Sequence, residues 1–290
     1  MSKILALQKN KLDDYLKVGF IQTVIDEKLA WESYPPSLNM KPIVEMKVWQ
    51  EIKNGFCSLS PEQPNIIVLP ELTLPHGYEK QLKGLSKAIG AIVIAGLDFE
   101  QFGSRGVKNK AIVVIPENWP EPKKSKRVSS VYFGKTFFSD AEKDFFKKFK
   151  YKPFPDTSTY IFYAGKFGNI GVAICSDFFD IERFVIYRGK IHHMIVIAHN
   201  KDSEAYYYLA EAISRLVYCN VVICNTGHYG DSLAFAPYRE SYRRTIYRHR
   251  GQSLFTTQVV KLPVFNLDEA QRRNDKHSEF KPPPPGYKKH

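Results

Sequence analysis

The sequence predicts an α/β protein built as a four-layer α-β-β-α sandwich. Its 290 residues contain many short runs rich in β-branched side chains, and several of these runs are apolar at every position. Such runs are typical of strands that are covered on both faces. Segments with helical spacing separate the runs, so we expect helices to pack outside two sheets that pack on each other.

The expected elements follow one another along most of the chain. The strands are 17–24, 65–70, 91–97, 110–115, 128–133, 159–164, 169–175, 191–198, 220–225, 232–236 and 254–260. The helices are 41–58, 78–89, 139–150, 178–189 and 203–219. A glycine-rich connection, AGKFGNIG, joins two of the strands and indicates a hairpin. No obvious linker interrupts the alternation, so residues 1–265 are expected to form one domain.

Residues 266–290 differ in composition from the rest of the chain. They end in KPPPPGYKKH, which is rich in proline and in basic side chains. Proline-rich sequence favours extended backbone, and few apolar side chains are present to form a core. We therefore expect an extended, basic C-terminal tail.

The net charge of +12 is concentrated in basic clusters at 123–127, 147–152 and 243–250. Such clusters could bind nucleic acid or an acidic partner. No recognised nucleic-acid-binding motif accompanies them, and a solvated basic surface is the simpler interpretation.

The four cysteines form no C-x-x-C pair and no zinc-like cluster with histidines, which predicts a reduced, cytoplasmic protein. The apolar stretch at the N-terminus is too short for a signal peptide. No apolar run approaches the roughly 18–20 residues of a membrane span, so no association with a membrane is expected.

Cys175 closes the apolar strand GVAIC and precedes residues that can begin a helix. A strand fixes such a thiol and a sharp turn exposes it. The N–H of the next residue, Ser176, together with the helix N-terminus, can lower the thiol pKa and bind an oxyanion. The alternative is an ordinary buried cysteine in the core.

Two further strands end in charged residues. Glu71 closes NIIVLPE, and a partly buried glutamate there would have a raised pKa and could accept a proton from a thiol. Lys135 closes VYFGK, and its ammonium could stabilise an oxyanion during acyl transfer. The alternatives are a solvated strand-end carboxylate and an ordinary exposed lysine.

The order Glu, Lys, Cys at strand ends resembles the carbon–nitrogen hydrolase (nitrilase) superfamily. The matching motifs are VLPEL, GKTFFS and GVAICSD, and the resemblance extends over about residues 16–262 through KVGFIQT, VVICNTG and GDSLAFAP. It implies a nitrilase-like fold and a small-molecule amide or carbamoyl substrate. It also implies a homodimer or higher homo-oligomer, and no metal or organic cofactor.

The resemblance also assigns roles. Cys175 would attack the carbonyl, Glu71 would act as the base, and Lys135 with the amide of Ser176 would hold the oxyanion. Water would then hydrolyse the thioester. A second family glutamate, which orients the lysine, corresponds to Glu142. Asp177, two residues after the cysteine, favours the amidase and carbamoylase branch over nitrilases.

His199 and Asn200 follow the strand 191–198, at an edge where the family gathers substrate-lining residues. Plain loop capping is the alternative for both. The sequence departs from the family pattern at Phe137 and Phe138, where a His-Leu pair is usual, which leaves the substrate open. Two other functions remain possible: a regulatory or interaction module on the same fold, and a soluble acyltransferase in which an amine replaces water.

Overall fold

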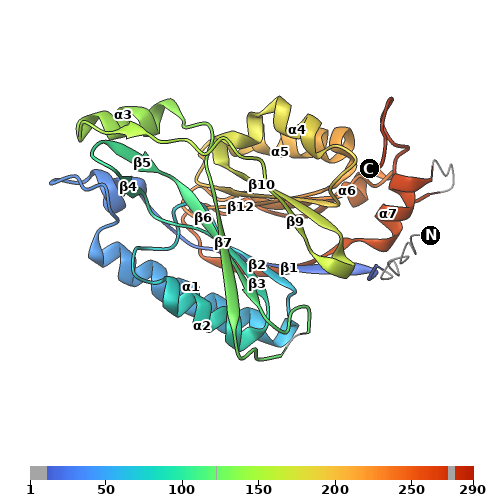
Figure 1. The fold of residues 1–290 in the computed structure, drawn as a ribbon, viewed down its shortest axis with the longest axis horizontal. Helices are drawn as coiled ribbons and strands as arrows, with labels where there is room; N and C mark the ends of the chain where they lie inside the picture. The colour runs from blue at the N-terminus through green and yellow to red at the C-terminus, as the bar shows by residue number, and fades with distance from the viewer. Residues whose placement is uncertain (1–11, 122, 274–277) are drawn as a thin grey trace, which may run out of the picture.

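The computed structural model describes residues 12–121, 123–273 and 278–290, and it has the predicted four layers. Two six-stranded sheets pack face to face in the middle of the molecule (Figure 1). Helices α1 (Pro42–Leu59) and α2 (Glu79–Ile89) cover the first sheet, and α4 (Ile181–Tyr187) and α5 (Ser203–Ile213) cover the second. No signal peptide is expected from the sequence, and the N-terminal residues on which this expectation rests lie largely outside the described ranges.

The two sheets come from the two halves of the chain, except for the last strand. The first has the order β15-β1-β2-β3-β6-β7, with β1 (Tyr15–Gln22), β2 (Ile66–Val68), β3 (Ile92–Gly96), β6 (Lys110–Pro116), β7 (Val128–Gly134) and β15 (Thr256–Pro263). The second has the order β14-β13-β12-β11-β10-β9, with β9 (Ile161–Tyr163), β10 (Asn169–Ile174), β11 (His193–Ala198), β12 (Asn220–Asn225), β13 (Ser232–Phe235) and β14 (Thr245–His249). Antiparallel pairing of β9 with β10 confirms the hairpin.

The remaining elements lie outside these layers. A small sheet contains β4 (Glu100–Phe102), β5 (Gly106–Lys108) and β8 (Lys152–Pro153). The other helices are α3 (Asp140–Lys148), α6 (Ser241–Arg244) and α7 (Phe265–Arg272). Short turns of helix are η1 (Lys28–Glu32), η2 (Ser60–Glu62), η3 (Gly165–Phe167), η4 (Cys175–Phe179) and η5 (Ser214–Tyr218). No described helix has the length and apolar character needed to cross a bilayer.

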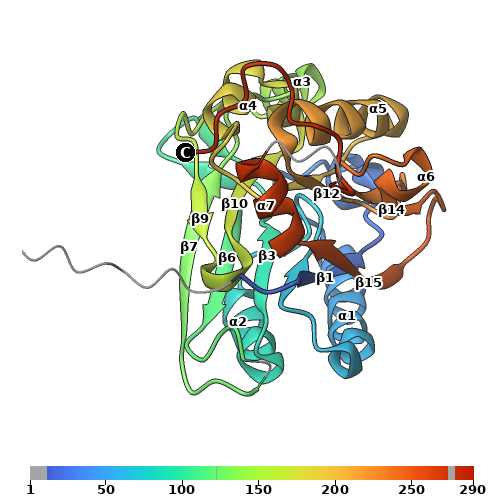
Figure 2. The same cartoon turned by 90° about the vertical axis from the view of Figure 1, so that its right-hand side faces the viewer.

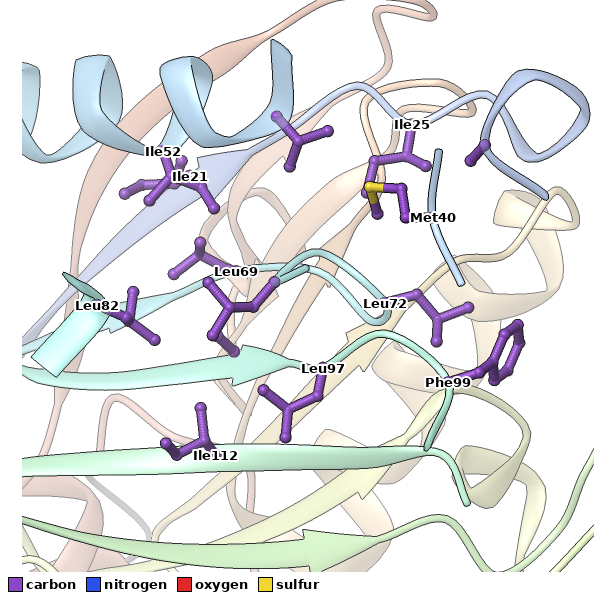
Figure 3. Packing of buried hydrophobic residues seen from close by; sticks show 14 of the residues in the cluster. Ile21, Ile25, Met40, Ile52, Leu69, Leu72, Leu82, Leu97, Phe99 and Ile112 are labelled. Carbon is purple, nitrogen blue, oxygen red and sulfur yellow. The ribbon is translucent and has the colours of Figure 1, made fainter. Parts of the chain in front are cut away.

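The core has three layers because side chains alternate between the two faces of each strand. In β1, Val18 and Phe20 belong to the buried cluster between the sheets, whereas Ile21 belongs to the cluster beneath α1 and α2 (Figure 3). Gly55 of α1 permits this contact, since a Cβ there would lie 2.6 Å from a methyl carbon of Ile21.

Strand direction brings the predicted site together. β1, β2 and β3 are parallel, and β7 runs in the same direction as β3 because two antiparallel steps, through β6, separate them. In the second sheet, β10, β11 and β12 are parallel. Residues that follow these strands therefore gather at the carboxyl edges of the sheets.

One prediction about the C-terminal part is wrong in detail. Residues 266–272 are not extended but belong to α7 (Figure 2). In addition, Phe280 is fully buried beside Tyr238 and Leu267. The basic cluster 243–250 contains the edge strand β14, whose residues are half-buried. Apolar side chains interspersed among the prolines and arginines give these segments a packing face that net composition conceals.

Candidate active site

A pocket of about 150 Å³ contains the predicted catalytic residues. Its charged and polar lining residues are Glu27, Glu32, Glu71, Lys135, Ser139, Glu142, Cys175 and His199. Its apolar lining residues are Trp31, Leu72, Phe99, Ala141 and Phe145. Residues from both sheets, from α3 and from η1 thus meet around one cavity.

Lys135 links two carboxylates in the wall of this pocket. Its Nζ lies 2.7 Å from Glu71 Oε1 and 2.7 Å from Glu142 Oε2, and its side chain is only 1% exposed. Burial by itself lowers the pKa of a lysine, but Glu142 and Glu71 outweigh it and raise the pKa of Lys135 well above its ordinary value. The ammonium is therefore a fixed positive charge.

Asn109 also connects these two carboxylates. Its Nδ2 donates to Glu71 Oε1 at 2.8 Å and to Glu142 Oε1 at 3.1 Å. Asn109 directly precedes the strand expected at 110–115, and no motif in the sequence marks its side chain as part of the site.

Glu71 is held in one orientation by backbone as well as side-chain contacts. Its Oε2 accepts a hydrogen bond of 2.9 Å from the backbone N–H of His199. Gly96 allows β3 to pass closely, since a Cβ there would lie 2.5 Å from the Cα of Glu71. Burial raises the pKa of Glu71, but Lys135 more than offsets this, so the pKa lies below its ordinary value. The raised pKa expected from the sequence is wrong, because the neighbouring ammonium dominates.

Cys175 lies at the sharp turn that the sequence predicted. Its φ is +48°, a left-handed conformation that a non-glycine residue rarely adopts, and it begins the short helix η4 directly after β10. Its Sγ lies 3.5 Å from the Tyr206 hydroxyl. Burial raises the pKa of the thiol to about 12, Glu71 adds to the rise and Lys135 opposes it. The resting cysteine is therefore a neutral thiol, and its deprotonation requires a base at the moment of attack.

Glu142 owes its position to the first turn of α3. Ser139 caps this helix, and the two residues form a capping box in which the Ser139 N–H donates to Glu142 Oε2 at 2.8 Å. The helix thus fixes the carboxylate that binds Lys135. Glu142 contacts the lysine, whereas the nearby Asp140 and Asp144 form exposed ion pairs.

Asp177 fixes the loop that carries the lysine. Its carboxylate accepts hydrogen bonds from the backbone N–H groups of Thr136 and Phe137 at 3.0 and 2.8 Å. It also lies 3.6 Å from the guanidinium of Arg183. Burial raises the pKa of Asp177 to about 6, although Arg183 and the two N–H groups oppose the rise. The residue thereby couples the cysteine turn to the lysine loop.

The three remaining predicted site residues have different surroundings. His199 lines the pocket, and its ring lies edge-on to Trp31 and Tyr229. The side-chain Oδ1 of Asn200 accepts a hydrogen bond from the Asp202 N–H at 2.8 Å, as the loop-capping alternative expected, and Asn200 does not line the pocket. Its backbone N–H and C=O exchange hydrogen bonds with the side chain of Asn225. Ser176 has a buried hydroxyl without a hydrogen-bond partner among the described residues, and its side chain does not line the pocket.

The outer wall of the pocket was not predicted from the sequence. Glu27, Trp31 and Glu32 come from the segment around η1, and Phe99 follows β3. The Trp31 Nε1–H donates to Asp98 Oδ1 at 2.9 Å, which anchors the indole beside Phe99. No local motif marks these residues, because they are brought to the site only by packing of distant segments.

Solved structures share this fold. A variant of the amidase from Nesterenkonia sp. AN1, with the acetamide moiety of fluoroacetamide covalently added at its active-site cysteine, matches with a TM-score of 0.63. The sequences are 11% identical over 86% of this chain and 91% of that one. Another variant, described as a nitrilase-superfamily amidase, gives 0.63 at 12% identity, covering 88% and 95%. A CN-hydrolase superfamily protein from Xanthomonas campestris with an arsenic adduct in its active site gives 0.62 at 13% identity, covering 89% and 94%.

No family model and no curated protein sequence matches the chain. The likeness to solved structures nevertheless extends over most of the chain and confirms that it has the fold of the nitrilase superfamily. The fold prediction that rested on the ordered Glu, Lys and Cys motifs is thereby confirmed.

Proposed function

We propose that this protein is a cysteine-dependent amidohydrolase that cleaves a carbon–nitrogen bond in a small amide or carbamoyl compound. The observation that carries the proposal is the convergence of Glu71, Lys135, Glu142 and Cys175 on one small pocket. The structural neighbours support it, because two of them are described as amidases. One of these carries a covalent addition at its active-site cysteine.

In the first half-reaction, Glu71 accepts the proton of the Cys175 thiol as sulfur attacks the substrate carbonyl. The negative charge that develops on the carbonyl oxygen is stabilised by the Lys135 ammonium and by the backbone N–H of Ser176. Glu71 then donates its proton to the departing nitrogen, which leaves ammonia or an amine and a thioester on Cys175.

In the second half-reaction, Glu71 deprotonates a water molecule that attacks the thioester. The same ammonium and N–H stabilise the second oxyanion, and the thiol leaves with the proton held by Glu71. Glu142 and Asn109 act on this sequence indirectly, since they position Lys135 and Glu71 through the hydrogen bonds described above. Glu142 is therefore a positioning residue.

The proposal can be tested by measuring amide hydrolysis and cysteine modification with the same protein. Incubation with small aliphatic amides should release ammonia, and Cys175→Ala should abolish the release, whereas Cys57→Ala, at the exposed cysteine, should not. Fluoroacetamide should modify Cys175 faster than Cys57, as followed by peptide mass spectrometry, and Glu71→Gln should slow that modification. Equal labelling of Cys175 and Cys57, with no amide hydrolysed, would refute the proposal.

The products of the same amide hydrolysis assay identify the acyl acceptor. With water as acceptor, the products are a carboxylic acid and ammonia. When hydroxylamine is added, it competes with water for the thioester, and formation of a hydroxamate then shows that this intermediate exists. An acyltransferase would yield product only in the presence of an amine.

A further inference from the structure

The charge of the pocket is opposite to that of the chain. Although the protein carries a net charge of +12, the pocket lining contains four glutamates and one lysine. The ammonium of Lys135 is already bound by Glu71 and Glu142, both at 2.7 Å. The other two glutamates of the lining, Glu27 and Glu32, are not bound by this ammonium.

These two residues bracket the short helix η1 at the outer part of the pocket. Their side chains are 44% and 42% exposed, so both are open to solvent and to a ligand. Glu27 lies 3.7 Å from the His199 Nε2, and this side chain, chiefly, lowers the pKa of Glu27 to about 2. Glu32 lies 3.7 Å from Lys148, which is half exposed and does not line the pocket.

The Nδ1 atom of His199 is a second sign of a ligand in this part of the pocket. The side chain is 6% exposed and lines the cavity. Its Nδ1 has no hydrogen-bond partner among the described residues, and its Nε2 has only Glu27, at 3.7 Å. Buried polar atoms are rarely left unsatisfied, so a polar group of a bound molecule is expected to fill this role.

Aromatic side chains form the wall beside these carboxylates. Trp31, Phe99 and Phe145 all line the pocket, with ring centroids 5.9 Å apart for the first two and 6.1 Å for the last two. Aromatic faces attract cations, and carboxylates nearby add to this attraction. A carboxylate on the substrate would be repelled by the same set.

We propose that the substrate carries a protonated amine at the end remote from its scissile carbonyl, and that Glu27 and Glu32 bind this ammonium group. The proposal rests on the proposed amidohydrolase function and specifies its substrate class as small cationic amides or carbamoyl compounds. The carbonyl lies against Cys175, the stem packs along the aromatic wall, and His199 hydrogen-bonds to the substrate between them.

Three amides of similar length test the charge preference. γ-Aminobutyramide is cationic, valeramide is its neutral counterpart and succinamate is anionic. We expect kcat/KM to be about tenfold higher for the cationic amide than for the neutral one, and lowest for the anionic one. Equal or greater kcat/KM for valeramide or succinamate would overturn the charge assignment while leaving the proposed hydrolase intact.

Glutamine variants test whether the carboxylates of Glu27 and Glu32 cause the preference for the cationic amide. Glu27→Gln, Glu32→Gln and the double variant should progressively reduce the ratio of kcat/KM for the cationic amide to that for the neutral amide, mainly through KM. Glu121→Gln removes a carboxylate that does not line the pocket and should leave the ratio unchanged. A ratio that is unaffected in the double variant would refute the assignment.

A binding measurement separates this inference from catalysis. Modification of Cys175 by fluoroacetamide should be slowed by n-butylammonium at concentrations where n-butanol and butyrate have little effect, and the double glutamine variant should lose this protection. Protection that is equal for the three compounds would contradict a cation site. If Cys175 is not modified at all and no amide is cleaved, the proposed function itself fails.

Discussion

At Cys175 the backbone conformation and the chemistry depend on each other. A φ of +48° is unfavourable for a residue with a side chain, yet it places the thiol at the end of β10, inside the pocket that Glu71 and Lys135 also line. Burial keeps the pKa of the thiol at about 12, so the cysteine is protected from indiscriminate reaction until a substrate and a base are in place.

Replacement of Lys135 should reduce activity, and it should reduce stability more strongly than replacement of any other residue of the site. Lys135→Met leaves the buried Glu71 and the nearby Glu142 without their ammonium, and removal of one partner from a buried ion pair costs about 3–5 kcal/mol. We expect no amide hydrolysis and a free energy of unfolding lower by that amount, measured by urea denaturation at pH 7.

The double variant Lys135→Met, Glu71→Gln is the control for this explanation. It removes one of the two uncompensated carboxylates, so it should recover part of the lost stability without recovering activity. The single variant should also gain stability as the pH falls, because protonation neutralises the unpaired carboxylates. A single variant as stable as the wild type would contradict the argument.

The titration of Asp177 should change the free energy of unfolding with pH. Its pKa is about 6 in the folded protein and its ordinary value is 3.8, so folding favours the protonated carboxyl. The contribution of Asp177 to stability is then fully present below pH 3.8 and is lost as the pH rises through about 6. The change is up to about 3 kcal/mol for a shift of two units.

Asp177→Asn tests this expectation. The difference in free energy of unfolding between wild type and variant should change over pH 4 to 6 and stay constant above about pH 7. Asp140→Asn, at a carboxylate that is 94% exposed, is the matched control. A wild-type-minus-variant difference that is flat across this range would exclude the raised pKa.

At the scale of elements, the C-terminal segment behaves as part of the domain. α7 and the residues after 277 pack on the second sheet, where Phe280 stacks on Tyr238 with ring centroids 4.8 Å apart. Lys289 reaches the buried Asp268 of α7 at 3.4 Å. The boundary predicted at residue 265 therefore crosses a continuous packed region.

Phe280→Ala measures how much this docking contributes. Truncation of a fully buried phenylalanine typically costs 3–5 kcal/mol, and we expect a loss of about that size in urea denaturation. Activity per folded molecule should be unchanged, since the residue does not line the pocket. Tyr242→Ala, at a side chain that is 81% exposed, should have little effect. A similar loss in both variants would exclude a specific contribution of Phe280.

For the whole molecule, the exposed apolar side chains around α4 support the predicted dimer. Ile181 and Val185 are 74% and 70% exposed, and Phe179 beside them is 52% exposed. Apolar groups gathered in this way on an outer helix are typical of an interface between subunits. We expect the two copies to pack through this face.

Charged substitutions test the interface. Ile181→Glu combined with Val185→Glu should convert a dimer to a monomer in light scattering after size exclusion. Ile43→Glu on α1 changes an isoleucine of the same exposed fraction, 74%, in the opposite helical layer and should leave the mass unchanged. A wild-type protein that is already monomeric at micromolar concentration would refute the prediction.

The sequence by itself determined most strands of the two central sheets, the hairpin and the fold, because runs of β-branched residues and the spacing between them are local properties. It did not predict the edge strand β14 or the small sheet of β4, β5 and β8. The sequence also identified Glu71, Lys135 and Cys175 as candidates, since each one closes a strand and the three occur in a known order. These inferences needed no knowledge of contacts. That the three strand ends meet depends on the packing of the two sheets, because β2 and β7 belong to the first sheet and β10 to the second.

Only the tertiary structure decided how the candidates interact and what surrounds them. The contacts of Asn109 and the acidic outer wall at Glu27 are assembled from segments far apart in the chain, so no motif of neighbouring residues could reveal them. The lowered pKa of Glu71 likewise depends on an ammonium 64 residues away in sequence. Local pattern fixes which element a residue belongs to, whereas the charge, burial and partners of its side chain depend on packing between elements.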